Sequence, residues 1–273
     1  MRGILTIGAA GAFAAAAASA SQMPPEALND LPGADIVILG ELHDNPWHHA
    51  NQARAVRALS PAAIVFEMLT PDHAAAAAKA DRDDPDALAS ALEWESRGWP
   101  DFAMYYPIFT AAPDAAIVGG GLEAATVRDA VSAGARAIFE THFDAAMARR
   151  LGLDAPLGDT AQTERESLQA RVHCDALPED LLPGMVEAQR LRDAVLAQAA
   201  IAAAAEGGPV VVITGNGHAR TDWGVPAKLA RAAPELTVLS IGQLESAPED
   251  MPPYDRWIVS EAPDRDDPCA AFD

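Results

Sequence analysis

The sequence predicts an α/β fold with a mostly parallel sheet flanked by helices, together with a helical insertion or lid. Six short runs rich in valine and isoleucine have the length of buried strands. Segments of helical character separate most of these runs, and such alternation indicates parallel βαβ units. Two long stretches, residues 85–112 and 135–205, contain no predicted strand. These stretches are therefore predicted helical excursions, which form either a lid or a partner surface.

The predicted strands are, in chain order, residues 34–40, 62–68, 115–121, 209–215, 236–242 and 255–261. The predicted helices are residues 46–59, 71–80, 124–131, 135–151, 178–205 and 225–232. The first of these helices has the clearest start, because Asp44 and Asn45 suit the N-cap and Pro46 suits the first helical position. We find neither a repeat nor a long low-complexity linker, so we predict a single domain over residues 21–273.

Residues 1–20 have the pattern of a secretory signal peptide. They contain one arginine, an alanine-rich apolar segment and the small-residue triplet Ala18-Ser19-Ala20, which predicts cleavage after Ala20. The apolar segment is shorter than the roughly 20 residues that a spanning helix needs. No cysteine lies near the cleavage site to carry a lipid. We therefore expect a periplasmic or secreted protein that is not lipidated.

The charge of the chain excludes two classes of partner. The formal net charge is −21, and removal of the predicted signal peptide deletes one arginine and no acidic residue, which leaves −22. Nucleic acids and anionic lipids are held by clusters of lysine and arginine, and such clusters are absent from this sequence. We therefore expect no nucleic-acid partner.

The chain has only two cysteines, Cys174 and Cys269. Export to an oxidising compartment favours one disulfide between them over two free thiols. This disulfide would tether the acidic C-terminal tail to the middle of the chain.

Polar residues and glycines follow four of the predicted strands. In open α/β sheets the ligand crevice lies beyond the carboxyl ends of the strands. The segments at these ends are Gly40-Glu41-Leu42-His43, Glu67, Gly119-Gly120-Gly121 with Glu123, and Gly215-Asn216-Gly217-His218. Their convergence at one edge predicts a functional site there.

His43, Glu67 and His218 form a candidate set of three metal ligands. Both histidines stand in the pattern Gly-x-x-His just after a strand, and imidazole with carboxylate suits Zn²⁺, Mn²⁺ or Fe²⁺. Glu67 lies in an apolar run, so its charge needs a partner, either a metal or an arginine. Glu41 is a second ligand, a general base for a metal-bound water, or a helix-capping carboxylate.

Further candidates surround this set. His48 and His49 lie in the first turn of the helix that begins at Pro46, where the helix dipole disfavours protonation. As neutral imidazoles they either bind a ligand or form hydrogen bonds; the alternative is that at least one of them belongs to a solvated helix surface. Arg192, on the predicted helix 178–205, either anchors a propionate, phosphate or carboxylate or forms a surface ion pair. His173, before that helix, is either structural or functional.

Residues 99–109, WPDFAMYYPIF, concentrate aromatic side chains in a chain that is only 5% aromatic. Core packing is one interpretation. The other is an apolar surface that receives a flat hydrophobic ligand or a second subunit, with Tyr105 or Tyr106 as the ligand of ferric haem iron.

Four blocks of the sequence together resemble one known family. They are ILGELHDNPWHHANQ, VFEM, HCDALPEDLLPGMVEAQRLRDAVLA and VITGNGHARTDWGVP, in this order along the chain. This arrangement, which extends over about residues 30–245, is similar to the ChaN family of haem-binding, iron-regulated proteins, within the Tiki and erythromycin-esterase-like superfamily. The resemblance places the paired histidine motifs at His43 and His218 and the acidic residue of the superfamily at Glu67.

The resemblance implies haem as cofactor and a role in haem or iron uptake. It also implies tyrosine ligation of haem at a homodimer interface, for which Tyr105 and Tyr106 are the candidates, and contact with the outer-membrane haem-uptake machinery. Because the superfamily includes metal-dependent hydrolases, the alternative is hydrolysis with His43, Glu67 and His218 around a divalent ion and Glu41 as base.

Overall fold

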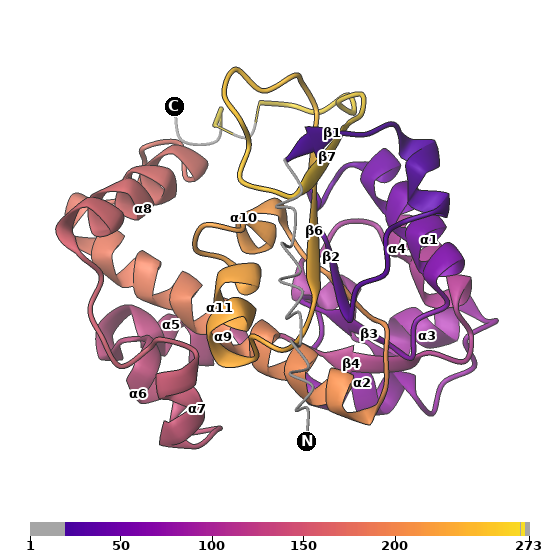
Figure 1. The fold of residues 1–273 in the computed structure, drawn as a ribbon, viewed down its shortest axis with the longest axis horizontal. Coiled ribbons are helices and arrows are strands. Elements are labelled where there is room, and N and C mark those ends of the chain that lie inside the picture. Colours follow the sequence, from indigo (N-terminus) through magenta and orange to yellow (C-terminus); the bar gives the residue numbers. More distant parts are fainter. Residues whose placement is uncertain (1–19, 268, 271–273) are drawn as a thin grey trace, which may run out of the picture.

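The computed structural model describes residues 20–267 and 269–270. At its centre lies a seven-stranded sheet with the order β1-β7-β6-β2-β5-β3-β4 (Figure 1), in which all neighbouring strands are parallel. The strands are β1 (Ser21–Gln22), β2 (Ile36–Leu39), β3 (Ala63–Phe66), β4 (Ala116–Gly119), β5 (Val210–Ile213), β6 (Val238–Leu244) and β7 (Arg256–Val259).

The helices of the described chain are α1 (Pro46–Leu59), α2 (Pro71–Ala77), α3 (Pro85–Ala91), α4 (Phe102–Ala111), α5 (Ala124–Ala133), α6 (Ala135–Phe139), α7 (Ala145–Arg150), α8 (Asp159–Val172), α9 (Leu182–Glu206), α10 (Asn216–Ala219) and α11 (Val225–Ala232). Three short 3₁₀ helices, η1 (Pro25–Asn29), η2 (Glu95–Arg97) and η3 (Glu179–Leu181), complete the described elements.

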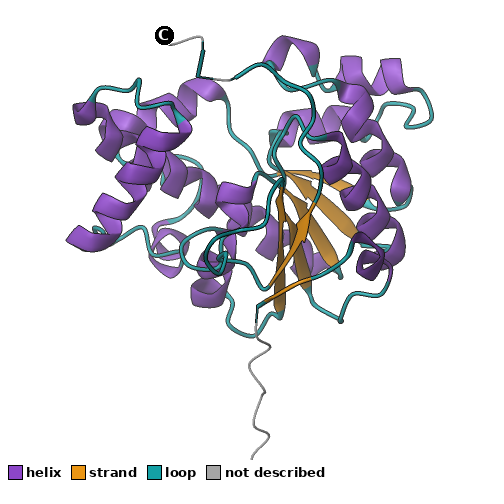
Figure 2. Ribbon diagram, turned by 90° about the horizontal axis from the view of Figure 1, so that it is seen from above, coloured by secondary structure: helices purple, strands orange, loops and turns teal. Residues whose placement is uncertain are grey.

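Helices cover both faces of the sheet (Figure 2). Successive side chains of a strand point to opposite faces, and in β2 both sets are buried. Val37 and Leu39 pack into a core with α1 to α4, whereas Ile36 and Ile38 pack into a second core with α5, α6, α7, α9 and α11. The uninterrupted apolar runs of the central strands therefore follow from burial on both faces.

The structure confirms the predicted α/β fold and differs from the prediction in detail. Strand β1 pairs with β7 but has no valine or isoleucine signal. The predicted helix 135–151 is divided into α6 and α7, because the Asp144 side chain accepts a hydrogen bond from the backbone of Met147 and starts a new helix. Residues 85–112 are helical and contain no strand, as predicted. They do not form a lid, since Tyr105, Ile108 and Phe109 of α4 are completely buried in the core.

The second strand-free stretch does form a helical excursion. Helices α6 to α8 of this stretch lie to one side of the sheet, and the long helix α9 returns from them to β5 (Figure 1). Helix α8 packs on α9. The excursion therefore supplies surface beside the carboxyl ends of the strands.

The predicted disulfide is confirmed, and its two Cα atoms lie 5.4 Å apart. It joins the segment between α8 and α9 to the C-terminal tail. Among the described helices none is long and apolar enough to cross a membrane. The predicted signal peptide falls on residues 1–20, of which 1–19 lie outside the described residues, and the single domain also stays a prediction.

Candidate functional site

The strand ends that the sequence pointed to converge at one edge of the sheet. Strands β2, β5 and β3 are neighbours in the sheet, and they lead directly into Glu41 and His43, Gly215 and His218, and Glu67. His218 Nε2 lies 3.5 Å from Glu67 Oε1. A Cβ atom on Gly215 would lie 3.1 Å from His43 Nε2 and 3.7 Å from Glu67 Oε2. The three predicted ligands therefore meet around Gly215.

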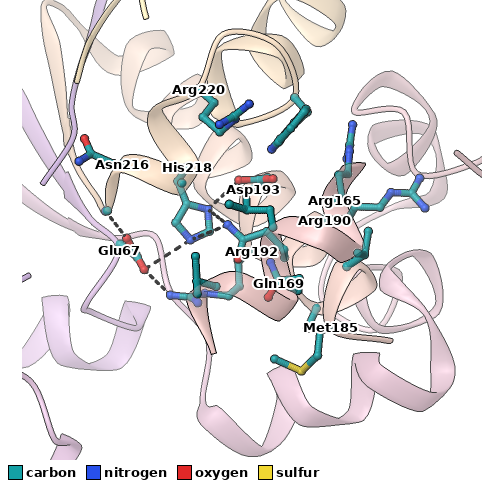
Figure 3. A pocket seen from close by; sticks show the side chains of 18 of the residues that line it. Glu67, Arg165, Gln169, Met185, Arg190, Arg192, Asp193, Asn216, His218 and Arg220 are labelled. Atoms are coloured by element: carbon teal, nitrogen blue, oxygen red, sulfur yellow. Dashed lines mark hydrogen bonds and ion pairs between the residues drawn. The ribbon is translucent and has the colours of Figure 1, made fainter. Parts of the chain in front are cut away.

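Glu67 is fully engaged by protein donors (Figure 3). Its Oε2 accepts hydrogen bonds from Thr214 Oγ1 at 2.6 Å and from the Gly215 amide at 2.7 Å. Its Oε1 accepts one from Arg192. Burial raises the pKa of Glu67, but the charges of His218 and Arg192 outweigh this effect and hold it well below its usual value. The partner that the sequence required for Glu67 is thus an arginine.

His218 lies between two carboxylates. Its Nδ1–H donates to Asp193 Oδ1 at 2.6 Å, and Nε2 faces Glu67. Burial lowers the pKa of His218, but Glu67 and Asp193 raise it to about 9. At neutral pH the imidazole is therefore a cation, which has no lone pair for a metal. The pairing of His218 with Asp193 could not be predicted from the sequence, because Asp193 lies on α9 and His218 on α10.

This pairing predicts a specific dependence of stability on pH. The folded pKa of about 9 exceeds the unfolded value of about 6.5. The contribution is therefore complete below pH ~6.5 and is lost as the pH rises through ~9. We expect the free energy of unfolding to fall by on the order of 3 kcal/mol over this window in the wild type. Urea denaturation measured along the pH axis should show a clearly smaller fall in His218→Gln. The exposed His142→Gln is the control, and equal pH profiles for all three proteins would contradict the assignment.

Glu41 orients His43, and both of its carboxylate oxygens accept hydrogen bonds from protein groups. Glu41 Oε1 accepts hydrogen bonds from Tyr105 Oη at 2.6 Å and from His43 Nδ1 at 2.7 Å, and Oε2 accepts one from Gln52 at 2.6 Å. The carboxylate is buried, whereas the side chain of His43 is 35% exposed. Burial lowers the pKa of His43, but the hydrogen bond to Glu41 and the charge of Glu67 raise it above its usual value. The exposed base of this pair is His43.

His48 and His49 belong to the scaffold of the site. Both are completely buried in α1, so the expectation of a solvated helix surface is wrong, and neither lines the cavity described below. His48 Nδ1 accepts a hydrogen bond from the Leu42 amide at 3.0 Å, and His49 Nε2–H donates to the His43 carbonyl at 2.9 Å. Burial lowers the pKa of His48 to about 4. The two rings therefore hold the turn that carries Glu41 and His43.

The two candidate tyrosines also have structural positions. Tyr105 is completely buried and donates to Glu41, and burial followed by that carboxylate raises its pKa far above the usual value. An axial tyrosine ligand is a phenolate, so this environment opposes ligation. Tyr106 donates to the Arg82 carbonyl at 3.0 Å, away from the site. Neither tyrosine fits the predicted haem surface, because α4 faces the core.

The Gly119-Gly120-Gly121 segment supports the site from behind. A Cβ atom on Gly119 would lie 2.2 Å from the Thr70 carbonyl oxygen, and one on Gly121 would lie 2.3 Å from the Glu67 carbonyl oxygen. Only glycine permits this approach. These glycines let the end of β4 pack on the segment that carries Glu67.

A cavity of about 540 Å³ opens beside these residues. The strand ends line one side of it, and α8 and α9 line the other. Its apolar lining includes Val127, Leu168, Met185 and Trp223. The cavity is also lined by four arginines, Arg165, Arg190, Arg192 and Arg220 (Figure 3). Three carboxylates, Glu41, Glu67 and Asp193, line the same cavity, so its wall carries groups of both charges.

Three of the four arginines have acidic partners. Arg190 pairs with Glu187, Arg192 with Glu67 and Arg220 with Asp222.

Arg165 differs from the other three. No described carboxylate forms an ion pair with it, and its Nε is buried without a hydrogen-bond partner. The guanidinium carbon lies 5.2 Å from the centroid of the Trp223 ring. Arg165 does not stand out in the sequence, because nothing in the mostly polar sequence of α8 shows which face of the helix lines the cavity.

The described residues contain no group of three histidine, cysteine, aspartate or glutamate side chains arranged to hold a metal ion. The physical reason lies in the predicted set itself. Both carboxylate oxygens of Glu67 accept hydrogen bonds from protein donors. Both ring nitrogens of His218 face carboxylates, Nδ1 toward Asp193 and Nε2 toward Glu67. The structure supports an ion-paired network at this edge of the sheet in place of a three-ligand metal centre.

A comparison with known protein families identifies the family of this chain. Residues 27–229 match the profile of a family described as haem-binding uptake, Tiki superfamily, ChaN. The chain belongs to the ChaN family. The match includes the strand ends, α8, α9 and Trp223, and leaves out Tyr254 and Cys269. No curated protein sequence matches the chain.

The chain is similar to two solved structures. ChaN of Campylobacter jejuni, solved with cofacial haem binding, is 18% identical, with 84% of this ChaN-family chain and 87% of that one covered at a TM-score of 0.61. At this identity the likeness shows the fold. The type III effector HopBA1 is 14% identical, with 87% and 92% covered at a TM-score of 0.44.

Proposed function

We propose that this chain binds haem in the arginine-lined cavity and takes part in haem or iron uptake in the periplasm. The observation that carries the proposal is Arg165, a half-buried cation that forms no ion pair with a described carboxylate and that lines the cavity next to the apolar Leu168. Haem combines a flat apolar ring with two carboxylates and brings an iron that takes axial ligands from protein side chains. Membership of a haem-binding family supports the same ligand.

The residues of the cavity fit the chemistry of haem. A volume of about 540 Å³ lies within the range of about 300–1,000 Å³ that is usual for ligand and cofactor sites. Leu168, Val172 and Met185 offer an apolar surface for the ring. Arg165 offers planar N–H donors for a propionate, and a partly buried cation without an acceptor gains most from such a partner. Arg192, the residue predicted from the sequence to bind a propionate, forms an ion pair with Glu67. We therefore propose Arg165 as the residue that binds the propionate.

The proposed location rests on two features. The N-terminal sequence has the pattern of a cleavable signal peptide, and the Cys174–Cys269 disulfide is typical of an oxidising compartment. The proposal includes a homodimer and the outer-membrane haem-uptake machinery as partners. Light scattering of the purified protein, with and without hemin, would measure whether the chain is a homodimer.

Hemin titration tests the role of Arg165. Loss of a charge-assisted contact costs about 1.5–3 kcal/mol, so we expect Arg165→Gln to weaken binding roughly tenfold or more. The exposed Arg57→Gln on α1 is the matched control and should leave the Soret titration unchanged. Hemin dimethyl ester, which lacks the propionate charges, should bind the wild type and Arg165→Gln equally. Equal hemin affinity in all three proteins would contradict the proposal.

One observation favours a second candidate function, hydrolysis. His43 is held by Glu41, is partly exposed and faces the cavity, which is the arrangement of a general base with its orienting carboxylate. Release of nitrophenol from p-nitrophenyl acetate should then be lost in His43→Ala, and zinc or manganese should raise the rate if the predicted divalent ion takes part. A rate equal to that of buffer, with or without these ions, would remove the candidate.

A further inference from the structure

Strand β4 forms the outer edge of the sheet. It pairs with β3 and, among the described strands, with no other. In a parallel ladder the N–H and C=O groups of alternate residues point to opposite sides of the strand. The amides of Ala116 and Gly120 donate to carbonyl oxygens of the segment that contains β3. The N–H and C=O groups of Ile117 and Gly119 therefore point away from β3, toward the free edge.

A groove of about 800 Å³ lies along this edge. Ile117, Val118 and Gly119 of β4 line it, together with α2 and the C-terminal half of α9. Both helices contact β4 (Figure 1). The groove shares no lining residue with the arginine-lined cavity. Because the unpaired groups of a sheet edge can pair with another chain, proteins usually cover or shorten such an edge. Here the edge lines an open groove.

The two helices lie on opposite faces of β4. Ile117 packs in the core that contains α2, whereas Val118 packs against the core that contains α9. The walls of the groove are rich in alanine, with Ala74, Ala75 and Ala78 on α2 and its C-cap, and Ala199, Ala202 and Ala203 on α9. Side chains of a strand alternate between its two faces. A strand that adds to β4 therefore turns one set of side chains to each wall, where the small alanines leave room.

Carboxylates lie at both ends of the groove. Asp72 and Glu123 come after the carboxyl ends of β3 and β4, and Glu206 comes before the start of β5. All three side chains are exposed, and none belongs to a described ion pair. The residues that line the groove include no lysine or arginine. This charge pattern suits a ligand with an apolar centre and a cation at each end.

One polar group in the wall of the groove lacks a partner. Gln198 lies on the α9 side, and its Oε1 is buried without a hydrogen-bond partner among the described residues. A buried acceptor in this state destabilises the free protein. An N–H group of a bound chain would satisfy it.

We propose that the free edge of β4 binds an extended segment of a partner protein, apolar in its centre and basic at both ends, which adds to the sheet as a further strand. Main-chain hydrogen bonds to Ile117 and Gly119 supply affinity, and the alanine-lined walls select the side chains. The basic ends pair with Asp72, Glu123 and Glu206. A second copy of this chain does not suit the groove, because it would bring carboxylates against carboxylates.

The test uses the full chain and a labelled synthetic peptide of about eight residues, with alternating valine and threonine in the centre and lysines at both ends. Fluorescence anisotropy should show saturable binding to the wild type. Ala202→Trp fills the groove and should weaken binding at least about tenfold. Ala205→Trp is the matched control, because Ala205 is exposed on the same helix and does not line the groove. Its affinity should equal that of the wild type.

Amide hydrogen exchange of the wild type shows whether the peptide pairs with the strand. Exchange at Ile117 and Gly119 should slow when the peptide binds, whereas exchange at Val118, whose amide faces β3, should not change. A peptide with the same side chains and an N-methylated backbone should bind at least about tenfold more weakly, and so should a peptide with glutamates in place of the lysines. Equal binding of either peptide would overturn the proposal. So would an unchanged affinity in Ala202→Trp or no saturable binding by the wild type.

Discussion

Replacing Glu67 by alanine is expected to destabilise the protein by about 3–5 kcal/mol, because it breaks a buried ion-paired network. The change leaves the Gly215 amide and the Thr214 hydroxyl without their acceptor. It also removes one of the two carboxylates that stabilise the buried cation of His218. Arg192 loses its partner too, although its side chain is 34% exposed and can be solvated.

Guanidinium unfolding of the wild type and Glu67→Ala measures this difference. Glu123→Ala is the matched control, since Glu123 is exposed and makes no capping hydrogen bond to α5, and its effect should stay within about 0.5 kcal/mol. A loss below about 1 kcal/mol for Glu67→Ala would show that the network does not hold the strand ends together.

Removal of the disulfide is expected to cost a similar amount. The two cysteines are separated by 95 residues, and in the chain-entropy account closure of a loop of this length stabilises the folded state by about 4–5 kcal/mol. The double variant Cys174→Ser, Cys269→Ser should therefore unfold at a much lower denaturant concentration. The loop contains α9, β5, β6 and β7. Loss of the disulfide should therefore lower the stability of the core and not only release the C-terminal tail.

Reduction of the wild type gives the control for this prediction. Dithiothreitol should bring the wild type to the stability of the double variant and should leave the variant unchanged. If the wild type without reductant unfolds at the same denaturant concentration as the variant, the bond contributes nothing and the prediction is contradicted.

The sequence predicted the strands and the edge of the sheet where the site lies for a physical reason. Strands buried on both faces are continuous apolar runs, so the polar residues at their ends stand out. Glu41, His43, Glu67 and His218 all follow from this contrast. Which charges pair could not be predicted, because the partners Asp193 and Arg192 come from a helix that reaches the edge of the sheet only through the tertiary fold.

The cavity itself depends on contacts that are distant in the sequence. Helix α8 is mostly polar and has no clear apolar face, so its sequence does not show that the face with Arg165 and His173 lines the cavity beside the strand ends. The aromatic segment of α4 illustrates the opposite case. Its sequence allowed either a core or a haem surface, and the stacking of Phe66 on Phe109, with ring centroids 4.4 Å apart, shows that it packs on the sheet.

A crystal structure of the protein with hemin would show where the haem binds. We expect one haem in the cavity between α8, α9 and the strand ends, with a propionate on the guanidinium of Arg165. A haem bound elsewhere, for example on α4 beside Tyr106 between two copies of the chain, with the cavity empty, would contradict it.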